Sequence, residues 1–186
     1  MTLMFDSSLI TYAVSLHFGR EVNEIIYSAM TSIADQTGNR FMIENKVPPH
    51  ITIGAFHAAR DDEGKLLQLV EDFAGEQEAG AVQFCEVGNF NNKVLFLRPE
   101  KNSFLTKINA ELHNLLLPIF SKAENGYYLP DIWFPHTTLA TGLNPSQFEK
   151  ARETAGEITL PLEAAIGELA GYQCSPFEEL QKYILK

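Results

Sequence analysis

Two hydrophobic periodicities alternate along the chain. Stretches in which every second residue is apolar predict β-strands, and stretches with apolar residues three and four positions apart predict helices. Gly38 is suited to end the first helix, and Asp61 and Asp62 can cap the second. The first half of the chain is therefore predicted to hold strands over 11–18, 47–56 and 81–87 and helices over 22–34 and 62–73.

The same order of elements returns after a predicted turn at residues 89–93. Asn144 can cap a helix that begins at Pro145 and ends at Gly156. The second half is predicted to hold helices over 104–119 and 145–156 and strands over 94–97, 133–143, 158–162, 166–172 and 180–185. This repeat predicts one α+β domain over residues 1–186, built from two similar lobes at about 10–90 and 93–186.

A proline, a histidine and a threonine recur at the same place in each half. The two stretches are PHITI at 49–53 and PHTTL at 135–139. Side chains two apart in a strand lie on the same face, so each histidine should stand beside its threonine, His50 with Thr52 and His136 with Thr138. One such pair could belong to an edge strand whose polar face is exposed to solvent. Its repetition at matching positions in the two halves indicates a functional site instead.

Two imidazoles facing each other suit displacement at phosphorus. Because the ordinary pKa of histidine is near 6.5, one ring can take a proton from the attacking oxygen while the other gives a proton to the leaving oxygen. Thr52 and Thr138 can donate hydrogen bonds to the non-bridging phosphate oxygens. The predicted catalytic residues are therefore His50 and His136, and this chemistry requires no metal or other cofactor.

These residues resemble a known family. The paired His-x-Thr motifs, the similar halves and the sequence from Trp133 to Ala140 are similar to the 2H phosphoesterases, which include LigT-like 2'-5' RNA ligases and 2',3'-cyclic nucleotide phosphodiesterases. The resemblance spans about residues 12–185. It implies a bilobal α+β fold with antiparallel sheets lining a central cleft, helices packed outside, and hydrolysis of a cyclic phosphodiester on a nucleotide or short RNA end.

Charge narrows the expected partners. The formal net charge is −10 and the pI is about 4.9, so the molecule as a whole repels a polyanion. We therefore expect a small nucleotide or cyclic phosphate, possible access of short RNA ends, and no long nucleic acid. Ligation of 2'-5' linkages and binding of phosphate ends without turnover stay open as alternatives, as does a metal-dependent hydrolase with both motif histidines as ligands.

Compartment and assembly follow from what the chain lacks. The first 16 residues carry no basic leader and no long apolar run, which predicts a cytoplasmic protein away from membranes. Cys85 and Cys174 form no disulfide or zinc motif. We expect a monomer.

A second group of residues could contact the substrate. His17 shares a predicted strand face with Ala13 and Ser15 and could line the cleft. Phe56 and Phe134 continue the parity of the motif histidines, whereas Trp133 and His57 should point the other way, and His113 should lie on the surface. The aromatic loop before the second motif, with Tyr127 and Tyr128, could form a lid that stacks on a nucleobase.

Overall fold

Eight strands and five α-helices make up the computed structural model, which describes residues 9–186. The strands are β1 (Leu9–Phe18), β2 (His50–Ala59), β3 (Gly80–Phe90), β4 (Val94–Pro99), β5 (Ser121–Lys122), β6 (Thr137–Ala140), β7 (Leu162–Cys174) and β8 (Phe177–Ile184). The helices are α1 (Arg20–Thr37), α2 (Phe41–Glu44), α3 (Glu63–Ala74), α4 (Ser103–Leu116) and α5 (Pro145–Ala155).

All pairings in the sheet are antiparallel. The strands follow the order β5-β2-β1-β7-β3-β4-β6, and β8 adds to β7. The long strand β7 joins the two sides, because residues 162–166 pair with β3 whereas residues 166–173 pair with β1. The motif strands β2 and β6 lie far apart in this order but contact each other in space. The sheet therefore curves back on itself around the motifs.

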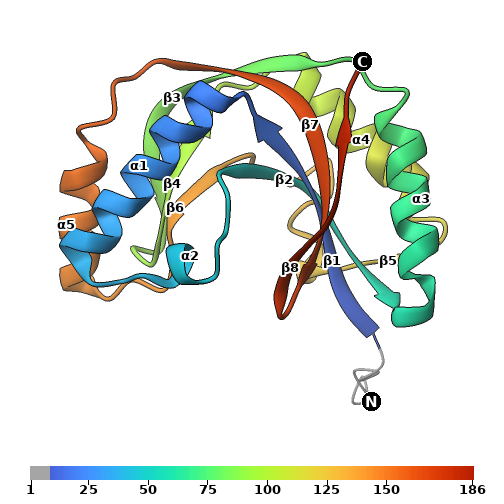
Figure 1. The fold of residues 1–186 in the computed structure, drawn as a ribbon, viewed down its shortest axis with the longest axis horizontal. Helices are drawn as coiled ribbons and strands as arrows, with labels where there is room; N and C mark the ends of the chain where they lie inside the picture. Colours follow the sequence, from blue (N-terminus) through green and yellow to red (C-terminus); the bar gives the residue numbers. More distant parts are fainter. Residues whose placement is uncertain (1–8) are drawn as a thin grey trace.

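Each half of the strand order packs against its own pair of helices. Helices α1 and α5 pack together beside β4 and β6, and α3 and α4 pack together beside β2 and β8 (Figure 1). Each pair combines one helix from each half of the sequence. Hydrophobic spacing defines a helix face but not the surface that this face covers, so the sequence alone does not predict this pairing of helices across the two halves.

Most predicted elements are present, and several boundaries differ. The helix that begins after Asn144 has the predicted capping box: the Asn144 side chain accepts from the Gln147 backbone N–H, and the Gln147 side chain accepts from the Asn144 N–H. The prediction of a strand over 158–162 was wrong, since β7 begins only at Leu162. Pro161 has no N–H to donate to a neighbouring strand. The predicted strand 133–143 shortens to β6, which follows Pro135.

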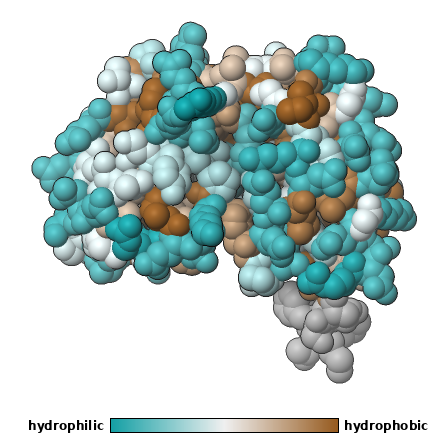
Figure 2. Space-filling view, in the orientation of Figure 1, coloured by the Kyte–Doolittle hydropathy of each residue, from teal (hydrophilic) through white to brown (hydrophobic). Residues whose placement is uncertain are grey.

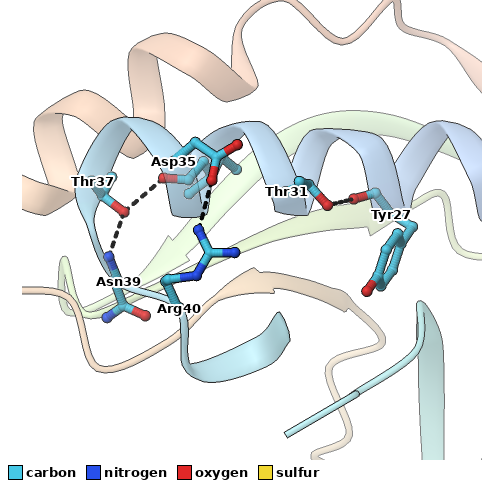
Figure 3. Close-up of polar contacts among 7 residues, drawn as sticks. Tyr27, Thr31, Asp35, Thr37, Asn39 and Arg40 are labelled. Carbon is cyan, nitrogen blue, oxygen red and sulfur yellow. Dashed lines mark hydrogen bonds and ion pairs between the residues drawn. The ribbon is translucent and has the colours of Figure 1, made fainter. Parts of the chain in front are cut away.

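Helix α1 ends where the sequence predicted. Gly38 adopts φ 71°, the left-handed conformation typical of a residue that follows a helix, and its N–H donates to the Ala34 carbonyl. The chain then turns into α2, with Thr37 Oγ1 accepting from the Asn39 N–H at 3.1 Å and Arg40 pairing with Asp35 at 2.6 Å (Figure 3). These contacts lead the chain from α1 toward β2.

The apolar core lies between the sheet and its helices. Strand β1 supplies fully buried Tyr12, Val14 and Leu16, while its alternate residues face the other surface of the sheet. Hydrophilic residues cover most of the outer face drawn in Figure 2, with separate apolar patches between them. No described helix is long and apolar enough to cross a membrane.

Candidate active site

A β-bulge in β2 sets which residues face the cleft. Thr52 pairs with Ser15 and Gly54 pairs with Val14, so Ile53 is the extra residue between them. Alternation therefore shifts by one position beyond Thr52. Ala55, rather than Gly54, continues the face of His50 and Thr52.

The bulge overturns two predictions based on simple alternation. Phe56 does not flank the cleft: it is fully buried, and its ring lies 5.3 Å from that of His113. His57 shares the face of Ala55 and hydrogen-bonds to Thr11 at 3.1 Å.

The prediction that His113 lies on the surface was also wrong. Only 3% of this residue is exposed, and its Nδ1–H donates to the Asn109 carbonyl.

The two motif histidines make the same backbone contact. His50 Nδ1 lies 2.7 Å from the Pro48 carbonyl oxygen, and His136 Nδ1 lies 2.8 Å from the Phe134 carbonyl oxygen. A carbonyl can only accept, so Nδ1 carries the proton in both rings. In each neutral ring Nε2 then holds the free lone pair that a general base needs.

Burial lowers the pKa of both imidazoles. For His50, removal from water is the main cause; the Pro48 hydrogen bond partly opposes it, and the charge of His136 lowers the pKa further. For His136, burial again dominates and the Phe134 hydrogen bond opposes it. The influence of one ring on the other means that the two histidines share one electrostatic environment.

Two cavities meet between the motif strands. A cavity of about 150 Å³ is lined by His50, Thr52, Ser15 and Tyr172. A larger one, of about 650 Å³, is lined by His136, Thr138, Tyr127, Trp133 and Phe134. Glu124 and Tyr128 line both. The cavities are therefore neighbouring parts of one cleft, with a motif histidine and a motif threonine in each part.

Polar contacts hold the cleft together across the two halves. Trp133 Nε1 donates to the Thr52 carbonyl at 3.1 Å, and Thr52 Oγ1 lies 3.2 Å from Ser15 Oγ. The prediction that Trp133 points away was wrong: residues 133–136 are not in a strand, so strand parity does not apply to them. Tyr127, Tyr128 and Phe134 lie in the cleft wall, and their contact with a substrate stays a prediction.

The surroundings of the two histidines differ. Phe90 and Phe96 stand 5.0 and 5.2 Å from the His136 ring, measured between centroids. His50 instead lies 6.2 Å from the rings of both His17 and Tyr172. One histidine thus sits among aromatic rings and the other beside a polar network.

That network is centred on Tyr172. Its hydroxyl donates to Glu179 Oε2 at 2.8 Å and therefore accepts from His17 Nε2 at 2.9 Å. His17 lies on the predicted face, opposite His50, but it is 4% exposed and lines neither cavity. Burial lowers the pKa of His17 to about 3, so its ring is neutral.

Sequence reasoning missed Tyr172 and Glu124 as residues of the cleft. Ser15 lines the His50 cavity and lies on the strand face that the sequence predicted toward the cleft. Tyr172 and Glu124 had no comparable signal, because their positions depend on pairing between distant segments. Within residues 9–186, no group of three His, Cys, Asp or Glu side chains is arranged to hold a metal ion.

The fold matches solved structures over almost its whole length. The crystal structure of E. coli LigT complexed with 3'-AMP covers 96% of this chain and 99% of its own, with a TM-score of 0.63 and 13% identity. A crystal structure from Thermus thermophilus covers 95% of this chain and 98% of its own, with a TM-score of 0.61 and 19% identity. The architecture is thus the bilobal α+β fold of LigT.

Sequence comparison then gives the family. The 2'-5' RNA ligase superfamily matches residues 30–173, a span that includes both motifs, and the chain belongs to that superfamily. It is also 29% identical over 104 residues to Bacillus cereus (strain G9842) and B. cereus (strain B4264) proteins provisionally named phosphoesterases. That match covers 54% of this chain and 56% of each relative.

Proposed function

We propose that this protein is a metal-independent phosphodiesterase that hydrolyses a 2',3'-cyclic phosphate, or a related cyclic phosphodiester, on a nucleotide or short RNA end. The observation that carries the proposal is the matched pair of Nδ1 contacts. Within residues 9–186, they leave Nε2 of His50 and of His136 without a hydrogen-bond partner, in adjoining parts of one cleft. Family membership supports the same reaction class.

The proposed reaction is an attack by water on phosphorus. One of the two motif histidines starts neutral, and its imidazole takes a proton from the water as the new P–O bond forms. The other starts protonated. As the bond from phosphorus to one ribose oxygen breaks, this second imidazole gives its Nε2 proton to that oxygen. The product is a 2'- or 3'-phosphomonoester, and the two histidines have exchanged protonation states.

Thr52 and Thr138 take the role of phosphate-binding donors in this proposal. Each lines the same part of the cleft as its histidine. Hydroxyls fixed in place can donate to the non-bridging oxygens, whose charge must stay stabilised as the bonds change. Tyr127, Tyr128 and Phe134 would contact the nucleoside, for which aromatic rings are suitable stacking partners.

Turnover of a substrate panel tests the proposal directly. The panel contains 2',3'-cyclic nucleotides, a 2'-5' linked dinucleotide and ADP-ribose cyclic phosphate, each assayed with EDTA and with the product phosphate located by NMR. We expect hydrolysis of a 2',3'-cyclic nucleotide. We expect His50→Ala and His136→Ala each to lower kcat by about 100-fold or more, because general acid and base catalysis typically contribute this much.

His57→Ala is the matched control. This histidine lies on the same strand and face as His50, near the far end of β2, and lines neither cavity. It should keep kcat within two-fold. Loss of activity in EDTA that returns with added metal would contradict the metal-independent reaction, as would near-normal rates in both motif variants. Joining of RNA ends without hydrolysis would instead favour the ligase alternative.

A further inference from the structure

The cleft carries an unusual charge for a site that takes a phosphodiester. Neither cavity wall contains a lysine or an arginine, and Glu124, which lines both parts of the cleft, is the one charged residue in either wall within the described part of the chain. Phosphate-binding sites ordinarily use cationic side chains. Glu124, an exposed residue, therefore adds a negative charge to the wall shared by both parts of the cleft.

Backbone geometry and backbone hydrogen bonds hold the main chain at Glu124 beside the motif strand β2. Glu124, Asn125 and Gly126 have φ values of 48°, 53° and 77°, a run of left-handed residues that costs about 1 kcal/mol or more at each non-glycine position. The run is anchored to the motif strand, because the Ala123 N–H donates to the Ala55 carbonyl at 2.9 Å and β5 pairs with β2. The turn closes with the Tyr127 N–H donating to the Glu124 carbonyl at 3.0 Å.

Neighbouring cations do not compensate this carboxylate. Among residues 9–186, no Lys, Arg or His nitrogen lies within 4.0 Å of it. Arg98 lies 6.0 Å from the Phe134 ring, but its guanidinium makes two contacts of 3.0 Å with Glu86. Lys122 lies against the turn at Gly126 and lines neither cavity.

The Glu124 charge raises the pKa of two neighbouring groups. It contributes to the raised pKa of Tyr128, about 12, and to that of Cys174, about 11, in both cases after burial as the larger cause. Tyr128 and Cys174 lie in the wall of the His50 cavity. The Glu124 carboxylate, although this residue is exposed, therefore lies close enough to influence groups in the wall of the His50 cavity.

We infer that Glu124 is a specificity-determining residue that restricts the cleft to phosphodiesters carrying a single negative charge. This inference rests on the proposed function and specifies its substrate class. The preferred substrates are 2',3'-cyclic nucleoside monophosphates, whose cyclic phosphate is their one anionic group. Nucleotides with a further phosphate are disfavoured, because a substrate that spans both histidines passes the Glu124 carboxylate at the junction of the two cavities.

A matched pair of substrates tests the inference. Adenosine 2',3'-cyclic phosphate and its 5'-phosphorylated form differ only in the additional phosphate. We expect the wild type to have a higher kcat/KM for the cyclic phosphate without the 5'-phosphate. Glu124→Gln should reduce the ratio of the two kcat/KM values about ten-fold by improving turnover of the 5'-phosphorylated substrate. This is the size of effect expected for charges at close range at a protein surface. Glu153→Gln removes the same charge from exposed α5, outside both cavities, and should leave the preference unchanged.

Binding of product-like ligands gives a readout that does not depend on turnover. In calorimetry, Glu124→Gln should strengthen binding of adenosine 3',5'-bisphosphate about ten-fold more than binding of 3'-AMP, for the same electrostatic reason. An equal effect on both ligands, or a substrate preference that Glu124→Gln leaves unchanged, would overturn the inference while the proposed function stands. Selective binding without turnover of either cyclic nucleotide would support charge selection and overturn the proposed function.

Discussion

Four histidines have lowered pKa values for a shared reason, which is that burial penalises the charged imidazolium. They are His17, His50, His113 and His136. His50 and His136 line the cleft and bind the backbone through Nδ1, with no hydrogen bond at Nε2 among the described residues, whereas His17 uses its Nε2–H to bind Tyr172. The same residue type therefore serves two purposes, according to whether its second ring nitrogen has a partner in the protein.

His17 should make stability depend on pH. Its folded-state pKa of about 3 lies below the ordinary 6.5, so between these values the unfolded chain binds a proton that the folded chain does not. Its contribution to the free energy of unfolding is therefore complete above pH 6.5 and is lost as pH falls, by about 2 kcal/mol at pH 5. Urea unfolding of the wild type and His17→Gln across pH 4 to 8 measures this contribution.

The difference between the two pH curves is the informative quantity. His50, His113 and His136 remain in both proteins, so their contributions cancel, and any uniform loss of stability in His17→Gln shifts its curve without changing the slope. We expect the wild type to lose more stability than the variant as pH falls from 7 to 5. Parallel curves would show that His17 has the same pKa in the folded protein as in the unfolded chain, and would contradict the expectation.

At the scale of elements, capping residues predict two helix ends well, whereas Asp62 precedes α3 at the expected place but makes no side-chain capping hydrogen bond. Asn144 and Gly38 bound α5 and α1 as expected, because capping hydrogen bonds are local and are made by the residues that signal them. Strand faces are less predictable. The bulge at Ile53 reverses the parity of Phe56 and His57, and a bulge depends on the partner strand as much as on the sequence of β2.

Removing the cap of α5 should lower stability without affecting catalysis. Asn144→Ala removes the hydrogen bond of 2.9 Å from the Gln147 N–H to Asn144 Oδ1. It also weakens the second bond of the capping box, of 3.1 Å from the residue 144 N–H to Gln147 Oε1. We expect a loss of about 1 kcal/mol and a Tm lower by about 2–4 °C, with kcat unchanged because α5 lines neither cavity. Lys150→Ala on the same helix is the control, and an equal fall in Tm for both variants would contradict a specific capping effect.

The whole molecule carries a field that opposes its proposed substrate. With a net charge of −10, the molecule as a whole repels an anion, and exposed charges are screened as salt is added. We expect kcat/KM for a 2',3'-cyclic nucleotide to rise about two-fold between roughly 20 and 200 mM NaCl. A second salt at matched ionic strength separates screening from competition by chloride.

A steep fall in kcat/KM with salt would contradict this expectation. Such a fall is the signature of cationic contacts to several phosphates, as in proteins that bind long nucleic acid. The experiment also separates two origins of selectivity, because screening acts on the field of the whole molecule, whereas Glu124→Gln removes one charge inside the cleft.

The sequence by itself determined what depends on near neighbours along the chain. It predicted most strands and helices, and it placed His50 on the face of Thr52, because two-residue alternation is a property of the strand. His136 precedes β6, so its position beside Thr138 does not follow from this alternation. The repetition of the motif identified the residues proposed to act, His50, Thr52, His136 and Thr138, before any fold was known.

Only the tertiary structure decided what depends on contacts between distant segments. Helices α1 and α5 form a pair although they come from different halves of the chain. The curved sheet brings β2 and β6 together, and pairing of β5 with β2 holds the turn that places Glu124 between the two parts of the cleft. Local patterns fix which face of an element is apolar, but long-range packing fixes which surface that face meets.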